Sequence, residues 1–373
     1  MTNSETFDAY SEMVGSRAEQ DPNLESACYS IDQMRCSDLL SLLTLLSESR
    51  SHDVTTESVI RGNRFHAPSS ISQRKFHQIE GEIMDALPET EFVELSPLQP
   101  FGINTVLAGT NEKNVVAALR RSEVNADAAT ALFRIAISKF DPQNGNSVRL
   151  ATNARISRAQ LFDGDTKFLP HFKIFAQVTV GKDDVPFGPS ELKTLADHLS
   201  SEVRTLDRIG QLPEARISRI NIAIGNVLFM QDLASQGRAD LAEIRRNTVS
   251  PDFHALEGLD IPHEIPFTMP DLESFLRDLG FSKGVRVISN FQQVIESHHP
   301  ELLPRLTIDL GRTAGIGYYK HLAYKISAEN YDEEHLPLVD GGTTPWASDY
   351  LNNRNLYTVT SGIGTELVGQ YFL

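Results

Sequence analysis

The sequence predicts an α+β fold, in which helices flank an antiparallel sheet and a mainly helical segment is inserted. Two predicted strand pairs, at 148–181 and 305–326, support this, because each pair is joined by a loop shorter than a crossover helix requires. A long amphipathic helix over 69–87 precedes them, and helical, proline-punctuated sequence fills about 237–299. These loop lengths disfavour a parallel, doubly wound sheet.

The chain divides into four predicted stretches. Residues 1–65 form an N-terminal extension, where clustered leucines predict an amphipathic helix over 31–46. Residues 66–190 and 300–373 form the two parts of the core, and residues 191–299 form a helical and strand insertion between them.

Local signals set the expected elements of the core. Ser69 or Ser70 is the expected N-cap of the helix over 69–87, and Pro97 and Pro100 end a strand that begins near 91. The remaining expected elements are a capped helix within 125–140, a helix over 190–206 capped by Ser190, a strand, Gly-Asn turn and helix over 217–234, and a strand, Gly-x-Gly turn and helix at the end of the sequence.

Composition narrows the function classes. The 373 residues are 40% hydrophobic, and no apolar run approaches the roughly 18 to 20 residues that span a bilayer. The acidic beginning lacks the order of a secretory signal, and Cys28 and Cys36 have no metal or redox spacing, so we expect free thiols in the cytoplasm. The net charge of −16 comes from dispersed acidic residues and disfavours nucleic-acid partners.

No metal site is expected either. Histidines occur at 254, 263, 298 and 299, but no pair of them stands with acidic partners at ligand spacing, so we interpret them as surface residues.

The most informative stretch is Arg305–Ile326, RLTIDLGRTAGIGYYKHLAYKI. Physical chemistry alone predicts a core hairpin, since β-branched and aromatic residues flank a glycine-rich turn. The stretch also resembles the second signature of histidyl-tRNA synthetases and their paralogs, through Asp-Leu-Gly at 309–311, Gly315 and the paired tyrosines at 318 and 319. The family's arginine and aspartate are replaced here by Ala314 and Gly317, so the resemblance implies the scaffold without its adenylation chemistry.

Three other segments resemble the class II synthetase motifs in the family's order, over about residues 69–373. The helix, strand and proline over 69–97 are similar to motif 1, which implies a homodimer. The strands around 148–181 are similar to motif 2, with Arg155 at the phosphate-binding arginine and Ser157 in place of the glutamate. The last segment is similar to motif 3, where Leu367 replaces the arginine.

The resemblance also implies ligand-binding positions. The family's histidine-reading glutamine and glutamate correspond to Ile174 and Val178, which cannot satisfy an imidazole, and its ammonium-binding carboxylate corresponds to Asp127. Asp127 has an alternative interpretation as a helix cap, and the arginines at 155 and 158 as surface or interface residues. The candidate ligand-binding residues are Asp127, Arg134, Arg155, Arg158, Tyr318 and Tyr319.

The resemblance implies a noncatalytic regulatory paralog, similar to the regulatory subunit of ATP phosphoribosyltransferase in histidine biosynthesis. Such a protein would form a homodimer, pair with a catalytic phosphoribosyltransferase subunit and bind a small anionic or zwitterionic effector, without catalytic residues, metal or cofactor. Because the resemblance ends at motif 3, we expect no anticodon-binding domain and no tRNA charging. The alternatives are an ATP-dependent ligase that activates a carboxylate for a non-tRNA acceptor, with Arg155 on the phosphate, and a purely structural dimer.

Overall fold

The computed structural model describes residues 65, 67–111, 114–118, 122–158, 169–247 and 255–373. The chain divides into two compact units, and the sheet and helices described below, apart from His171 at the start of one strand, belong to the unit formed by Ser70–Arg158 and Phe172–Leu373. The helix predicted at 31–46 lies outside the described residues, as do Cys28, Cys36 and His254.

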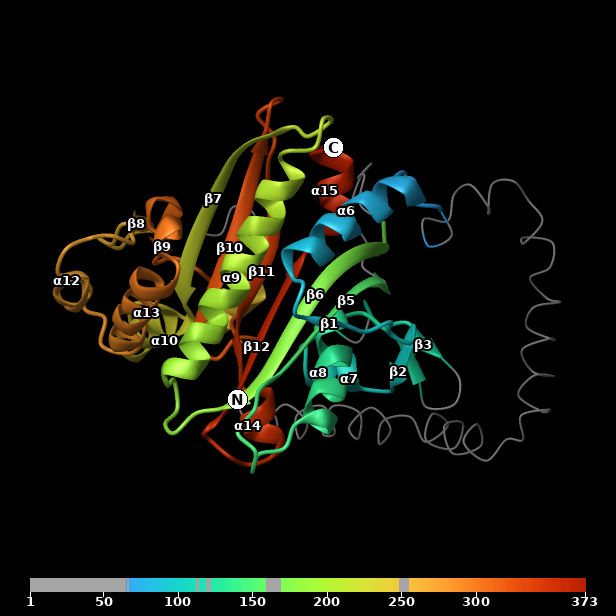
Figure 1. Cartoon of the computed structure of the whole chain (residues 1–373). Coiled ribbons are helices and arrows are strands. Elements are labelled where there is room, and N and C mark those ends of the chain that lie inside the picture. The colour runs from blue at the N-terminus through green and yellow to red at the C-terminus, as the bar shows by residue number, and fades with distance from the viewer. Residues whose placement is uncertain (1–64, 66, 112–113, 119–121, 159–168, 248–254) are drawn as a thin grey trace, which may run out of the picture. The chain divides into compact units, whose positions relative to one another are not determined.

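A nine-stranded sheet organises this unit (Figure 1), which confirms the prediction of a large sheet flanked by helices. Its strand order is β1-β5-β6-β12-β11-β10-β7-β9-β8. In chain order these are β1 (Glu91–Phe92), β5 (Val148–Ser157), β6 (His171–Lys182), β7 (Ile217–Asn226), β8 (Glu264–Pro266), β9 (Leu306–Asp309), β10 (Leu322–Asn330), β11 (His335–Thr344) and β12 (Leu356–Ile363). Among the described pairings, β1 with β5 and β7 with β9 are parallel, and the others are antiparallel.

Helices cover the two faces of this sheet. One face carries α6 (Gln73–Ala86), α9 (Pro189–Ile209), α13 (Val285–His298) and α15 (Thr365–Tyr371), and Figure 1 shows α9 running along the strands. The other face carries α8 (Ala128–Lys139) and α14 (Trp346–Tyr350). The other helices within the described residues are α7 (Ile103–Val106), α10 (Val227–Ser235), α11 (Leu241–Asn247), α12 (Leu272–Asp278) and the 3-10 helix η2 (Pro300–Arg305).

The alternation of side chains along β6 defines the two faces. Phe175 belongs to the core under α9, and Gln177 and Thr179 hydrogen-bond with α9 residues. Ala176 and Val178 belong to the separate core under α8. We call these the α9 face and the α8 face, and each buries its own apolar layer.

The pairing predicted within 305–326 is wrong. Strand β7 lies between β9 and β10 and pairs with both, so the two strands of this stretch are not neighbours. The predicted pairing assumed that consecutive strands meet, but β7 adds an antiparallel ladder along the whole of β10. Residues 191–299, predicted as an insertion, thus contribute β7 and β8 to the same sheet.

Several element ends also differ from expectation. Ser72, not Ser69 or Ser70, caps α6 by accepting a hydrogen bond from the backbone N of Lys75. Helix α9 begins after Gly188, without a side-chain cap from Ser190. The strand expected from 91 to Pro100 is divided, and its second half is β2 (Leu98–Pro100), which joins β4 (Ser122–Val124) and β3 (Ala117–Ala118) in a small separate sheet.

Candidate functional site

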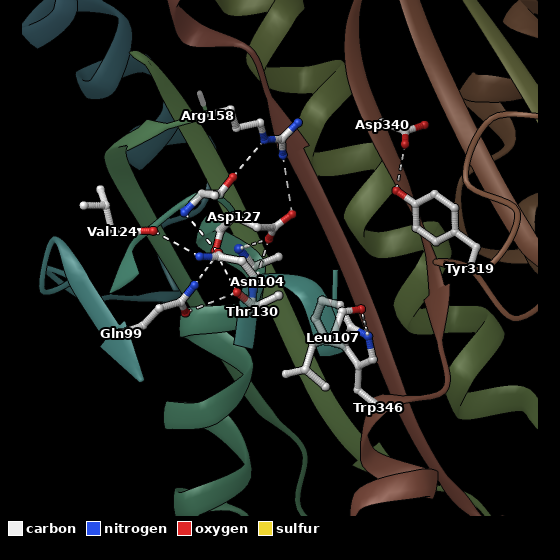
Figure 2. Close-up of polar contacts among 12 residues, drawn as sticks. Gln99, Asn104, Leu107, Val124, Asp127, Thr130, Arg158, Tyr319, Asp340 and Trp346 are labelled. Atoms are coloured by element: carbon white, nitrogen blue, oxygen red, sulfur yellow. Dashed lines mark hydrogen bonds and ion pairs between the residues drawn. The ribbon is translucent and has the colours of Figure 1, made fainter. Parts of the chain in front are cut away.

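A carboxylate and a guanidinium meet where α8 begins, on the α8 face. Asp127 caps this helix, because its Oδ1 accepts hydrogen bonds from the backbone N of Ala129 at 2.9 Å and of Thr130 at 3.1 Å. Its Oδ2 lies 3.6 Å from a terminal nitrogen of Arg158 (Figure 2). Asp127 therefore has the predicted capping role and also presents a negative charge beside Arg158.

Arg158 is held in place by two further contacts. Its Nε donates to the backbone O of Ala126 at 2.8 Å, and its guanidinium lies over the Phe172 ring, 5.8 Å from the centroid. The side chain remains 37% exposed, so part of the guanidinium is open to solvent or to a ligand. A positioned, partly exposed arginine is suited to binding a carboxylate or phosphate.

A buried amide network fixes the segment that carries this pair. Asn104 Oδ1 accepts from the backbone N of Ala126 at 3.0 Å, and its Nδ2 donates to the backbone O of Val124 at 3.0 Å. The Gln99 side-chain amide donates to the same Asn104 oxygen, and the Glu123 carboxylate accepts from the backbone N of Asn104 at 2.7 Å (Figure 2 shows the amides). Because these side chains are fully buried, they hold the backbone before α8 rigidly.

The two predicted tyrosines follow a tight turn near this pair. Gly315 has a φ of +81°, and the Tyr319 ring packs on it so closely that a Cβ there would lie 2.3 Å from the ring. Tyr318 packs edge-on against Tyr319 and against Trp346, with centroid distances of 4.9 and 5.3 Å. Burial, and after it the charge of Asp127, raises the pKa of Tyr318 well above its ordinary value, so this hydroxyl stays protonated beside the carboxylate.

Tyr319 belongs to a second polar group that sequence reasoning missed. Its hydroxyl donates to Asp340 Oδ2 at 2.9 Å, and the buried Arg312 donates to the other oxygen of the same carboxylate. Arg312 packs over Gly225, where a Cβ would lie 2.3 Å from its Cδ. The signal was present in the sequence, because Arg312 directly follows Gly311 and Asp340 directly precedes Gly341, yet only the glycines drew attention.

The other two predicted residues lie elsewhere. Arg155 points to the α9 face, where it pairs with Glu366 of α15 at 3.1 Å and lies over the Phe76 ring of α6. Strand alternation explains this, because Ile156 packs in the α8 core and its immediate neighbour must face the opposite way. Arg134 is exposed on α8. The structure thus brings Asp127, Arg158, Tyr318 and Tyr319 to one face, and neither Arg155 nor Arg134 joins them.

We found no group of three or more His, Cys, Asp or Glu side chains arranged to hold a metal ion in the described ranges. Similarly, none of the helices described is long and apolar enough to cross a membrane.

Comparisons with known proteins agree on the architecture. Neither a protein-family model nor a curated protein sequence matches the chain. Among solved structures, an ATP phosphoribosyltransferase regulatory subunit/histidyl-tRNA synthetase from Bacillus halodurans matches with a TM-score of 0.62 and 14% identity, over 83% of this chain and 82% of that chain. A histidyl-tRNA synthetase from Nostoc sp. matches with a TM-score of 0.56 and 14% identity, over 82% and 74%.

A histidine–tRNA ligase subunit from Alicyclobacillus acidocaldarius matches with a TM-score of 0.55 and 14% identity, over 79% of this chain and 92% of that chain. Identities this low establish a shared fold and no more. The sheet order, the helices on both faces and these matches together show that the chain has the class II aminoacyl-tRNA synthetase-like fold of histidyl-tRNA synthetases and their paralogs.

Proposed function

We propose that this protein is a noncatalytic, cytoplasmic regulatory subunit, of the kind that serves ATP phosphoribosyltransferase in histidine biosynthesis, and that it binds a small anionic or zwitterionic effector. The observation that carries the proposal is the Asp127–Arg158 pair on the α8 face, separated from Arg155 by the sheet. Asp127 and Arg158 are suited to recognising a ligand. Two of the arginines that would bind a triphosphate are replaced by Ala314 and Leu367, and Arg155 points to the opposite face of the sheet.

The pair is suited to both ends of a zwitterion. The Asp127 carboxylate can accept hydrogen bonds from an ammonium group, and the exposed part of Arg158 can donate two parallel hydrogen bonds to a carboxylate. The protonated hydroxyl of Tyr318 lies near enough to Asp127 for that charge to affect its pKa. Because the buried amide network positions Asp127 before any ligand arrives, little ordering entropy is lost on binding.

Three positions argue against an adenylation activity. Ala314 and Leu367 stand where the resembled synthetases have arginines, and Leu367 packs against the apolar core of the α9 face. Losing one preorganised donor to a developing charge typically costs about 3 to 4 kcal/mol of transition-state stabilisation, and here two are replaced. Arg155, the remaining candidate for a phosphate contact, is engaged with Glu366.

Binding and exchange assays separate this proposal from the ligase alternative. Calorimetry against the twenty amino acids should find a binder whose affinity falls about tenfold or more in Arg158→Gln and in Asp127→Asn. Asparagine is also a good N-cap, so Asp127→Asn removes the charge while it preserves the helix start. Arg286→Gln, at an exposed arginine on α13, is the matched control. Micromolar affinity for ATP with magnesium, together with amino-acid-dependent pyrophosphate exchange, would refute the regulatory proposal in favour of a ligase.

We also propose a homodimer built through α6 and β1. A groove of about 600 Å³ runs between these elements and β5. Its lining is mixed: Met84, Phe92 and Leu95 are apolar, and charged residues include Glu80, Arg155 and Lys173. Met84 is 45% exposed, and β1 is an edge strand of the sheet. A second copy that covers this groove would remove apolar surface and a free strand edge from water.

Sedimentation with matched variants tests the dimer. Met84→Glu should shift the protein toward monomer at micromolar concentration, whereas Tyr331→Glu, at an exposed aromatic residue outside this groove, should not. A monomeric parent protein would contradict the proposal. Co-sedimentation with a catalytic phosphoribosyltransferase subunit tests the partner separately, and failure to associate would leave the effector site standing but remove the regulatory assignment.

A further inference from the structure

A second polar cavity lies on the α9 face, away from the Asp127–Arg158 pair. It has a volume of about 350 Å³ and lies between the end of α6, strand β5, helix α9 and the residue after α13. This volume is at the lower end of the range for small-molecule sites. Its charged and hydroxyl-bearing lining residues are Glu89, Thr90, Arg149, Asp197, Ser201, Arg204 and His299.

Two arginines line this cavity without carboxylate partners. Arg149 donates from a terminal nitrogen to Gln177 Oε1 at 2.6 Å and to Ser201 Oγ at 3.3 Å, while its Nε is buried without a hydrogen-bond partner. Within the part of the chain that the structure describes, neither Arg149 nor Arg204 forms an ion pair. An unmet donor on a partly buried guanidinium such as that of Arg149 is costly.

Two carboxylates line the cavity: that of Glu89 is exposed, and that of Asp197 is already engaged. Asp197 lies 2.9 Å from His299 Nε2 and 2.7 Å from Lys193 Nζ. Burial opposes its charged form, but the hydrogen bonds from these two partners outweigh burial and lower the pKa of Asp197 to about 2. Its charge is therefore present at neutral pH and shared with two donors other than the arginines.

The two arginines are close enough to affect each other. Burial is the main cause that lowers the pKa of Arg149; Asp197 and Glu202 oppose this effect, and the positive charge of Arg204 adds a smaller lowering contribution. An anion between the two guanidinium groups would be attracted by both positive charges. Guanidinium forks match the oxygens of phosphate and carboxylate groups in shape and charge.

We infer that this cavity binds a small molecule bearing a phosphate or carboxylate group, held between Arg149 and Arg204. The site is separate from the proposed effector site, because Arg149 lies on the α9 face and Arg158 on the α8 face. The anion sits against the end of α6 and the turn that follows it, so its binding stabilises the connection from α6 to the edge of the sheet.

Calorimetry of the whole chain with inorganic phosphate, and separately with citrate, distinguishes the two anion sources. At least one should bind with one-to-one saturation, and Arg204→Ala should weaken it by about tenfold or more. Arg204 is exposed, so this substitution leaves the core intact, and Arg219→Ala at another exposed arginine should bind as the parent does. Arg149→Lys retains the charge but loses the fork, and should also weaken binding.

The same titrations can overturn the inference. Absence of saturable binding by either probe would do so, as would an affinity that Arg204→Ala leaves unchanged. Binding that disappears in Arg158→Gln and persists in Arg204→Ala would place the anion at the effector site instead. Phosphate binding that persists in Arg158→Gln supports this cavity whether or not the effector proposal holds.

Discussion

Substitution of Glu202 by glutamine should change how stability depends on pH. Glu202 is fully buried on α9, where its carboxyl accepts a hydrogen bond from the Tyr324 hydroxyl at 2.6 Å. Burial raises the pKa of Glu202 from its ordinary 4.5 to about 7, although hydrogen bonds from Tyr324, Ser361 and Gln177 partly oppose this rise. The native state therefore holds a proton that the unfolded state releases above about pH 4.5.

The direction of this pH dependence follows from which state, folded or unfolded, binds more protons. Between about pH 4.5 and about pH 7 the folded chain binds more, so this carboxyl makes the free energy of unfolding fall as the pH rises. At about 1.36 kcal/mol per pKa unit, a rise from 4.5 to about 7 corresponds to roughly 3 kcal/mol. Glutamine cannot ionise, so Glu202→Gln should gain roughly this amount relative to the parent between about pH 5 and about pH 8.

Urea denaturation of the parent and of Glu202→Gln at a series of pH values measures this difference. Subtraction of the two profiles cancels the contributions of the buried histidines His198 and His321, whose lowered pKa values destabilise the fold as the pH falls. Glu257→Gln, at an exposed carboxylate, is the control and should show no such trend. A difference between parent and Glu202→Gln that stays flat from about pH 5 to about pH 8 would refute the reasoning.

Two further substitutions test packing and charge near the candidate site. Gly315→Ala should lower the free energy of unfolding by about 2 to 3 kcal/mol more than Gly109→Ala, since both glycines have positive φ but only the first faces a tyrosine ring. Equal losses in the two variants would argue against the close packing. Asp340→Asn should lower the free energy of unfolding by about 1 to 2 kcal/mol, because it removes the negative charge that pairs with the buried Arg312. The loss is smaller than for a fully buried ion pair, because Asp340 is 52% exposed. Asp332→Asn, in a surface ion pair, is its control, and thermal denaturation that ranks the two equally would contradict the prediction.

Local chemistry predicted much of this fold from the sequence. The strand pair over 148–181 was foreseeable because β-forming residues flank a polar loop, and the structure has β5 and β6 there. The cap at Asp127 was foreseeable because aspartate precedes an apolar helical pattern, and the carboxylate does accept two backbone hydrogen bonds. Both features depend on residues close together in the chain.

Features that depend on distant residues were not predictable in the same way. The two strands within 305–326 are separated by β7, whose pairing with both depends on residues about a hundred positions earlier. The partner of Arg312, Asp340, likewise comes from a strand whose register only the folded sheet defines. The position of Arg312 in its motif therefore did not predict that Asp340 is its partner.

Arg155 illustrates a signal that the sequence did contain. Leu150, Ala154 and Ile156 all pack in the core of the α8 face, so the residue two positions after Ile156 continues on that face and Arg155 does not. Motif position favoured Arg155, whereas strand alternation favoured Arg158, the residue just after β5. The structure agrees with alternation, because Arg158 reaches Asp127.

The packing of the α9 face does not depend on the arginines that the resembled synthetases have at positions 314 and 367. On the α9 face, His198 is fully buried and hydrogen-bonds with Thr179 and Ser361, which ties α9 to two strands of the sheet. None of these groups depends on an arginine at 314 or 367: Ala314 is exposed, and Leu367 adds apolar contact to the core. An arginine is therefore not required for folding at either position. A synthetase and a regulatory subunit can share this fold, so the fold does not distinguish them. The ligand that binds to Asp127 and Arg158 does distinguish them.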